Sequence, residues 1–319
     1  MLFRSLERAG WNVEEDGLLG SPPLRVIVGE EAHATILSAL RFLGLGSGRA
    51  YRVEADGQGR MKPEALRQVL ARGAGPSIIC AQAGNVNTGA FDPLDEIAAI
   101  ARQHGAWLHV DGAFGLWAAA SPGRRQLTQG LDQADSWATD AHKWLNVPYD
   151  SGLAIVADPV AQRAALSKRA AYLVPADGSE RDNHDFTPES SRRARGFALY
   201  AALRSLGREG VADLVARCCR LAARLAAQLG AHAGVRVLNQ VVLNQVLVRF
   251  EPPNAGDADA FTRAVIARIQ REGTCWASGT RWQGREALRF SVSNWSTTEA
   301  DIDRSAQAVL AAARSEGGR

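Results

Sequence analysis

One lysine in this sequence lies where an amine could do covalent chemistry. Lys143 directly follows His142, on a turn after segment 135–139, which we expect to be a strand. Lysine is rare here, since only Lys62, Lys143 and Lys168 occur among the 37 lysines and arginines. An amine can lose its proton and form a Schiff base with an aldehyde, whereas a guanidinium stays charged. Lys143 is therefore a candidate for covalent attachment of a carbonyl compound, against the commoner alternative of a surface lysine at a turn.

A carboxylate 32 residues upstream adds a second chemical group. Asp111 follows the apolar run 106–110, which predicts a buried parallel strand with the acid at its carboxyl end, where α/β sheets hold ligands. A buried carboxylate needs a cationic partner, and the protonated ring nitrogen of pyridoxal phosphate is such a partner. Alone, Asp111 would more often cap a loop. Together with Lys143, it predicts a site for pyridoxal 5′-phosphate.

Two segments around these residues resemble the cofactor motifs of the group II pyridoxal-phosphate-dependent amino-acid decarboxylases. They are His109-Val-Asp-Gly-Ala-Phe-Gly115 and Asp140-Ala-His-Lys-Trp-Leu145. Further family motifs are resembled by segments 29–33, 81–93, 191–195 and 288–293, so the resemblance covers the whole chain. It implies the aspartate-aminotransferase fold (type I) and decarboxylation of an L-amino acid to the amine and carbon dioxide, with the Schiff base on Lys143.

The resemblance also implies roles for other side chains at the cofactor. His33 would stack on the cofactor ring, and Asp111 would pair with the ring nitrogen. His142, Thr139 and Ser136 would donate hydrogen bonds to the phosphate.

Two further residues are assigned more loosely. Asn85 follows a predicted strand and is expected to touch the cofactor. Tyr172 precedes the polar stretch 175–188, which we expect to be a loop that closes over the site, and it would protonate the product after decarboxylation. Both have ordinary alternatives, a structural amide and a packing tyrosine. His109 lies two residues before Asp111 and is expected on the same strand face, with a catalytic or a structural role left open.

One departure from the family is large. The small-residue loop that grips the cofactor phosphate in the family's first third has no counterpart, and segment 1–11 resembles the end of the helix that follows this loop. We therefore expect a decarboxylase without its N-terminal third, through truncation, a misplaced start or a split gene. An aminotransferase of the same fold and a non-catalytic pseudoenzyme that pairs with a full-length homologue remain alternatives. The amino-acid substrate is left open.

Composition limits the other classes of function. A net charge of +3 over 319 residues gives no reason to expect nucleic-acid binding. The four cysteines lack metal-ligand spacing, which predicts reduced thiols, no metal and a cytoplasmic protein. We find no apolar run of about 18 residues and no secretory signal pattern, so no membrane association is expected. The family resemblance implies a homodimer with the active site near the interface.

The spacing of apolar residues predicts the strands and helices that would position these residues. Short β-rich runs at 25–28, 50–53, 77–80, 107–110 and 153–156, together with 135–139, alternate with helical patterns such as 63–70 and 93–101. This order predicts an α/β fold with a mainly parallel sheet and helices on both faces. Beyond the loop, a long helix is expected at 191–229. A small α+β domain would follow, with strands at 235–238, 241–250 and 289–292 and helices near 257–272 and 298–314. We place the cofactor-binding large domain at 1–205 and the small C-terminal domain at 206–319.

Overall fold

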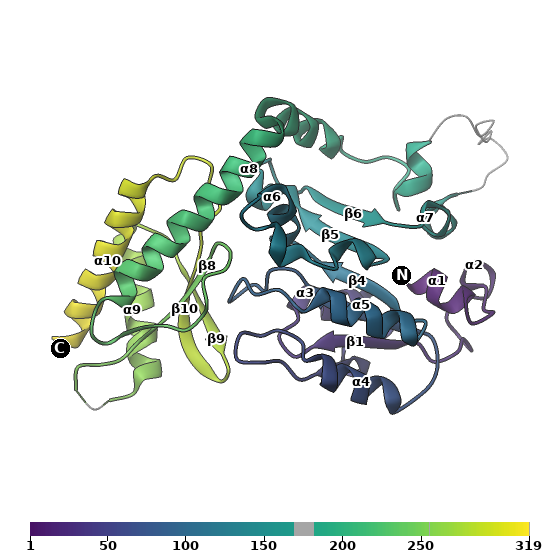
Figure 1. Cartoon of the computed structure of the whole chain (residues 1–319), viewed down its shortest axis with the longest axis horizontal. Helices are drawn as coiled ribbons and strands as arrows, with labels where there is room; N and C mark the ends of the chain where they lie inside the picture. The colour runs from purple at the N-terminus through teal and green to yellow at the C-terminus, as the bar shows by residue number, and fades with distance from the viewer. Residues whose placement is uncertain (169–181, 255, 319) are drawn as a thin grey trace.

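The computed structural model describes residues 1–168, 182–254 and 256–318, and it contains two β-sheets flanked by helices (Figure 1). The six-stranded sheet has the order β2-β1-β3-β4-β5-β6, and the four-stranded sheet has the order β7-β8-β10-β9. In Figure 1 the larger sheet lies on the right and the smaller one on the left. The expected combination of a main α/β unit and a smaller α+β unit is confirmed.

The larger sheet is mainly parallel, as predicted. Strands β1 to β5 pair in parallel, and only β6 is antiparallel to its neighbour β5. Every residue of β1 and β3 is buried, which fits a parallel sheet covered on both faces. The strands are β1 Arg25–Gly29, β2 Tyr51–Val53, β3 Ser77–Gln82, β4 Trp107–Asp111, β5 Ser136–Asp140 and β6 Gly152–Val156.

Helices cover this sheet on both sides, because the strand residues alternate between two hydrophobic clusters. Ile27 and Ile79 pack with helices α4 and α5 on one face. Val26 and Ile78 pack with α3 and α7 on the other. The helices of this lobe are α1 Leu2–Glu7, α2 Val13–Asp16, α3 Ala34–Phe42, α4 Pro63–Ala71, α5 Leu94–Gln103, α6 Ala141–Trp144 and α7 Pro159–Leu166, and the 3-10 helices are η1 Ser47–Arg49, η2 Gly115–Ala120, η3 Arg125–Thr128, η4 Leu131–Gln133 and η5 Asn183–Phe186.

The smaller sheet is antiparallel, and three of its strands were predicted. The exception is β9, which pairs with β10 through the two-residue turn Gln283–Gly284. Both turn residues have positive φ (47° and 77°), the geometry of a hairpin turn that follows the twist of the strands. The elements are α8 Arg195–Gly230, β7 Val235–Val237, β8 Gln245–Phe250, α9 Ala258–Glu272, β9 Ser278–Trp282, β10 Arg285–Ser291 and α10 Glu299–Gly317.

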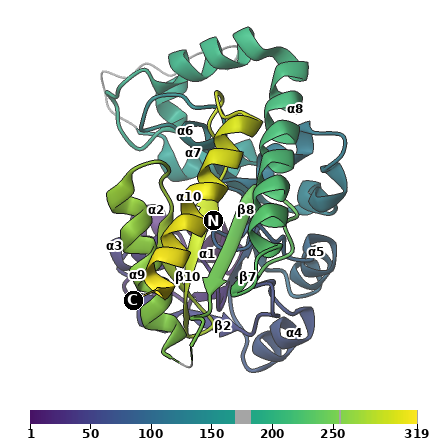
Figure 2. The ribbon, with the colours of Figure 1, turned by 90° about the vertical axis from the view of Figure 1, so that its left-hand side faces the viewer.

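Helix α8 joins the two lobes and is interrupted at Gly207, whose φ of 62° and ψ of −175° are not helical. Before the kink, Leu199 packs against the loop around Leu145 in the larger lobe. After the kink, α8 lies beside α10, where Arg224 pairs with Asp303 (Figure 2). The kink lies close to the expected boundary between residues 205 and 206, and the division itself stays a prediction.

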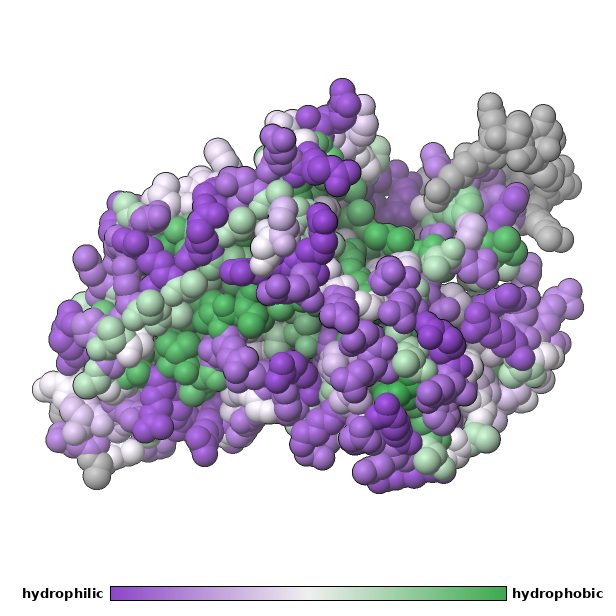
Figure 3. All heavy atoms as spheres, in the orientation of Figure 1, coloured by the Kyte–Doolittle hydropathy of each residue, from purple (hydrophilic) through white to green (hydrophobic). Residues whose placement is uncertain are grey.

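The distribution of polar and apolar side chains on the surface is that expected when each helix packs its apolar side toward the interior. Hydrophilic side chains cover most of the face shown in Figure 3, with apolar ones between them. Within the described ranges, no helix combines the length and the apolar composition needed to cross a bilayer.

Candidate active site

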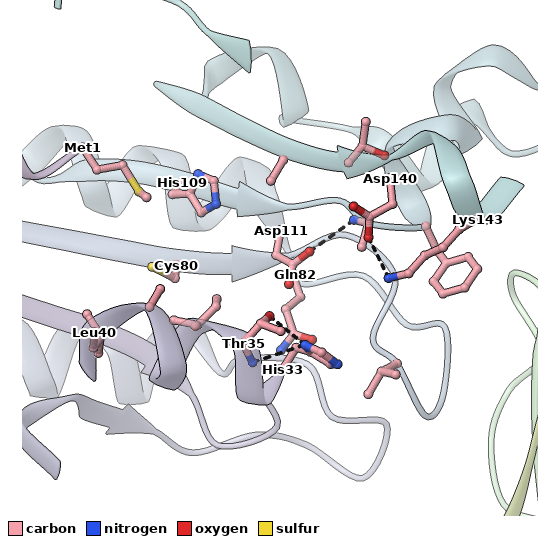
Figure 4. A pocket seen from close by; sticks show the side chains of 18 of the residues that line it. Met1, His33, Thr35, Leu40, Cys80, Gln82, His109, Asp111, Asp140 and Lys143 are labelled. Carbon is pink, nitrogen blue, oxygen red and sulfur yellow. Dashed lines mark hydrogen bonds and ion pairs between the residues drawn. The ribbon is translucent and has the colours of Figure 1, made fainter. Parts of the chain in front are cut away.

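A cavity of about 1080 Å³ opens at the carboxyl ends of β3, β4 and β5. Figure 4 shows it from close by, with Lys143 at one end and Met1 at the other. The carboxyl edge of a parallel sheet is where α/β folds hold ligands. Arg289 and Ser291 of β10 also line the cavity, so both lobes contribute to its wall. The sequence placed Lys143 and Asp111 at this edge, and both line the cavity.

Lys143 reaches the cavity because α6 begins directly after β5. Its Nζ lies 2.9 Å from Asp140 Oδ2 and 4.8 Å from the centroid of the Phe114 ring. The side chain is 27% exposed, so its amine is open to a ligand in the cavity. No role of Asp140 or Phe114 was predicted from the sequence, although the three-residue spacing of Asp140 and Lys143 was a signal.

Asp111 is the last residue of β4, and its carboxylate points into the cavity (Figure 4). Among the described residues, the hydrogen bond to this carboxylate comes from the Ala113 N–H, at 3.2 Å from Oδ1. A carboxylate can accept several more. Asp111 therefore keeps acceptor capacity for a cationic or hydrogen-bonding ligand.

His33 lies on the opposite wall as the N-cap residue of α3. Its Nδ1 accepts from the Thr35 N–H at 3.4 Å and lies 2.8 Å from Thr35 Oγ1. With Nδ1 acting as an acceptor, the neutral ring carries its proton on Nε2. The helix start thus fixes the orientation of a flat ring at the cavity.

His142 and Thr139 offer hydrogen bonds at the Lys143 end. His142 Nδ1 accepts from the Ser151 N–H at 3.1 Å, which leaves the ring proton on Nε2, and the ring packs 4.2 Å from the Tyr149 ring. Thr139 Oγ1 is buried and has no hydrogen-bond partner among the described residues. A buried hydroxyl without a partner is costly, so Thr139 is suited to a ligand oxygen. Both residues line the cavity, and their expected role at the phosphate stays a prediction.

The structure argues against the expected phosphate role of Ser136. Ser136 lies at the beginning of β5, three residues before Thr139, where it pairs with His109 of β4. It is not among the residues that line the cavity. Its hydroxyl accepts from Trp107 Nε1 at 2.8 Å and lies 2.9 Å from His109 Nδ1. Ser136 is used within the sheet, too early on its strand to reach the ligand edge.

Asn85 also differs from its expected role. Its side chain is 1% exposed and does not line the cavity. Nδ2 donates to Glu31 O at 3.1 Å, and Oδ1 accepts from the N–H groups of Asn87 and Thr88 at 2.9 and 3.2 Å. These bonds shape the loop after β3, so a contact with the cofactor is not supported. Tyr172, the other loosely assigned residue, lies outside the described residues.

His109 shares the cavity wall with Asp111, as the two-residue spacing predicted. Burial lowers the pKa of His109 from 6.5 to about 4, so its ring is neutral near pH 7. A neutral ring leaves the charge of Asp111 available to a ligand.

Arg289 is a site residue whose role the sequence analysis missed. It belongs to β10, and its Nη1 donates to Val86 O at 3.1 Å and Ser291 Oγ at 3.2 Å. Burial lowers the pKa of its guanidinium. A single charged side chain within the apolar run Leu288–Val292 was the available signal. Arg289 gives the cavity a second cation besides Lys143, from the other lobe.

These groups together suit an aromatic aldehyde with a basic ring nitrogen and an anionic arm. They offer an amine, an acid, a flat ring and two side-chain donors, from Lys143, Asp111, His33, Thr139 and His142. No group of three or more His, Cys, Asp or Glu residues that could hold a metal was found in the described part of the chain.

Comparisons with known proteins agree with this chemistry. A family model described as the pyridoxal-dependent decarboxylase conserved domain matches residues 2–251. Acidic amino acid decarboxylase GADL1 of Mus musculus is 34% identical over 251 residues, which are 76% of this chain and 46% of that protein. Cysteine sulfinic acid decarboxylase of Mus musculus is 32% identical over 314 residues, 91% of this chain and 63% of that protein.

The fold is also similar to that of a solved structure. The crystal structure of mouse CSAD superposes with a TM-score of 0.89 at 26% identity, covering 99% of this chain and 68% of that one. The chain thus spans about half the length of the GADL1 relative, 46%, and about two thirds of the CSAD structure, 68%.

Proposed function

The chain belongs to the pyridoxal-dependent decarboxylase family, and we propose that it binds pyridoxal 5′-phosphate and decarboxylates an L-amino acid. The observation that carries this proposal is the amine of Lys143 in a cavity that also holds Asp111 and His33. When bound, the cofactor supplies an electron-accepting ring that stabilises the negative charge left on the α-carbon as carbon dioxide departs.

Each side chain then has a defined task. Lys143 Nζ holds the cofactor covalently through its aldehyde carbon. Asp111 accepts from the protonated ring nitrogen and so keeps the ring electron-poor. His33 packs its flat face against the ring. Thr139 Oγ1 and His142 Nε2 donate to the phosphate, which supplies the partner that the buried Thr139 hydroxyl lacks.

The substrate class is proposed from Arg289. Its guanidinium is a permanent cation in the cavity wall and can pair with a carboxylate or sulfinate of the substrate. Two relatives are named for acidic amino acids and cysteine sulfinic acid. Acidic amino acids are therefore the first substrates to test. Tyr172 as the acid that protonates the product is part of the same proposal.

A homodimer with the site near its interface is also proposed. Tyr149 at the cavity and Phe197 and Tyr200 at the start of α8 are 72%, 78% and 63% exposed. Arg193, in the segment that leads into α8, donates to Tyr149 O at 2.7 Å. This segment therefore lies beside Tyr149. Exposed aromatic side chains are enriched at protein interfaces. Light scattering should report a dimer that Phe197→Ser with Tyr200→Ser weakens, and a monomer at all concentrations would contradict it.

A cytoplasmic location is proposed from the free thiols of the four cysteines.

Borohydride reduction with pyridoxal phosphate tests the central assignment. We expect the reduced cofactor on the Lys143 peptide, because Lys62 is paired with Glu54 outside the cavity and Lys168 Nζ donates to Ser190 at 3.0 Å. Lys143→Met should remove the label, while Lys168→Met serves as the control and keeps it. Labelling confined to Lys62 or Lys168 would overturn the assignment. Carbon dioxide release from cysteine sulfinate, aspartate and glutamate then tests the activity, and a labelled but inactive chain would favour the pseudoenzyme.

A further inference from the structure

The Lys143 amine is held by two contacts. Its Nζ forms an ion pair of 2.9 Å with Asp140 Oδ2 (Figure 4), and it lies 4.8 Å from the centroid of the Phe114 ring. A carboxylate and an aromatic face each stabilise an ammonium group. The ammonium nitrogen has no lone pair, so it cannot attack an aldehyde until its proton has gone. The amine must therefore leave the Asp140 ion pair before it can attack an aldehyde.

Within the described residues, Asp140 is the carboxylate in ion-pair contact with this amine. The other titratable or charged groups that face the same part of the cavity are Asp111 on β4, His33 at the start of α3, His142 on α6, Tyr149 in the following loop and Arg289 on β10. Of these, Asp111 is the other anion, and no ion pair joins it to Lys143. Removing the charge of Asp140 therefore removes the nearest electrostatic restraint on the amine.

A second hydrogen-bond donor lies close to the Asp140 carboxylate. His142 Nε2 lies 3.8 Å from the same Oδ2 atom. Its Nδ1 already accepts from Ser151 N–H, so Nε2 carries the proton that Asp140 can accept. The main chain of Asp140 is held by the pairing of β5 with β6, opposite Gly152. A side-chain rotation is enough to move the carboxylate from Lys143 to His142.

We propose that Asp140 is a positioning residue that holds the Lys143 amine in a closed ion pair in the cofactor-free chain, slows its reaction with aldehydes, and transfers to His142 when an aldehyde without a phosphate engages Lys143. The inference rests on the proposed role of Lys143 as the aldehyde-reactive amine. It assigns Asp140 a task of its own: the carboxylate aims the amine into the cavity and opposes premature modification by other carbonyl compounds.

The test uses a neutral aldehyde, pyridine-4-carboxaldehyde, so that phosphate binding does not enter. The neutral amine forms a bond to the aldehyde carbon, the carbonyl oxygen leaves as water, the ammonium proton goes to solvent, and borohydride reduces the carbon–nitrogen double bond. Mass spectrometry of the three lysine peptides gives a rate for each lysine in one sample. At pH 8, Asp140→Asn should label Lys143 about 2- to 5-fold faster than the unchanged chain, the range expected for a partly exposed ion pair.

Matched variants separate this effect from a general one. Asp140→Glu keeps the charge and should stay slow. Glu54→Gln removes the partner of Lys62 on the surface and should leave Lys143 labelling unchanged, because that pair lies outside the cavity. Thermal melting confirms the fold, and Asp140→Ser gives the same comparison if the asparagine variant melts early.

The possible results separate a failure of the inference about Asp140 from a failure of the proposed function. Equal Lys143 rates in the unchanged chain and in Asp140→Asn overturn the inference and leave the role of Lys143 intact. Absence of Lys143 labelling in every variant, with Lys62 and Lys168 labelled, overturns the proposed function. A structure of Lys143→Met checks the transfer, since Asp140 Oδ2 should then lie about 2.8 Å from His142 Nε2. An Oδ2 atom that still lies beyond hydrogen-bond distance from His142 would exclude this step.

Discussion

At the residue scale, burial acts in opposite directions on two titratable side chains of the larger lobe. Asp92 is buried and accepts from the N–H groups of Met61 and Gln82, both at 2.7 Å. Burial outweighs these bonds and raises the pKa of Asp92 from 3.8 to about 6. Burial lowers the pKa of His109 to about 4. Both groups are therefore mainly uncharged in part of the range between pH 4 and pH 6.

Asp92 should stabilise the fold most at low pH. The folded chain binds the Asp92 proton more tightly than the unfolded chain, so the stabilising contribution is full below about pH 4 and is lost as the pH rises through about 6. The free energy of unfolding of the native chain relative to Asp92→Asn should fall by on the order of 3 kcal/mol between pH 3.5 and pH 7. Urea unfolding at several pH values measures it, and a pH-independent difference would contradict it.

His109 should show the opposite slope. Its pKa is lower in the folded chain than in the unfolded one, so its contribution is full above about pH 6.5 and is lost as the pH falls through about 4. The free energy of unfolding relative to His109→Gln should therefore decrease on acidification, by a similar amount. The two slopes partly cancel in the native chain, so each becomes visible only against its own variant. A rising difference on acidification would show that His109 is charged in the fold.

At the element scale, the loops at both ends of the strands position the site. Asp111 and Asp140 are the last residues of β4 and β5, and α6 places Lys143 one turn further. The entry to β5 is set by η4, where the Leu131 carbonyl accepts from Trp137 Nε1 at 2.8 Å. Gly130 precedes η4 and packs against the start of α5.

A pair of glycine substitutions tests this close approach. Gly130 and Gly10 both have a φ of 80°, but a Cβ at Gly130 would lie 2.3 Å from Asp95 N, whereas nothing lies within 4 Å at Gly10. Gly10→Ala should cost only backbone strain, about 1 kcal/mol. Gly130→Ala should cost on the order of 3 kcal/mol or more, because the backbone of α5 must move. Equal melting temperatures of the two variants would show that the loop relaxes freely.

At the scale of the whole molecule, the cavity is completed by contacts between the lobes. Arg289 Nη1 donates to Val86 O at 3.1 Å, Asn239 Nδ2 donates to Thr88 O at 2.9 Å, and Asn146 Nδ2 donates to Ser293 O at 2.9 Å. These bonds hold the smaller sheet against the loops after β3 and β5. The site therefore depends on the docking of both lobes.

The phosphate should add little to cofactor binding by this chain. The proposal gives it the donors Thr139 and His142, while the carboxylate of Asp140, 3.8 Å from His142 Nε2, repels a dianion. Two hydrogen bonds to a charged group are worth roughly 1.5–3 kcal/mol each, and the repulsion should bring their sum to the lower end of that range, about 3 kcal/mol or less. Pyridoxal phosphate should then bind no more than about 100-fold more tightly than pyridoxal, as measured by absorbance titration. Tight stoichiometric binding of pyridoxal phosphate alone would contradict this expectation.

The sequence by itself determined the elements and the two groups at the strand ends. Apolar periodicity is a local property, so it predicted β1 to β6, helices such as α4 and α5, and the edge where Asp111 and Lys143 lie. It missed β9, whose residues alternate weakly and are held by pairing with β10. The positions of His33, His142 and Thr139 at the cavity also followed from family motifs read along the chain.

Tertiary structure decided which polar side chains are available to a ligand. Ser136 is occupied by Trp107 and His109 of the neighbouring strand, and Asn85 is occupied by its own loop and by Glu31, 54 residues away. Arg289 enters the cavity from the other lobe. A hydrogen-bonding group serves a ligand only if the fold leaves it without another partner, and those partners come from segments distant in sequence. Local patterns can therefore locate a site, but only the packed structure shows which of its groups remain free to act.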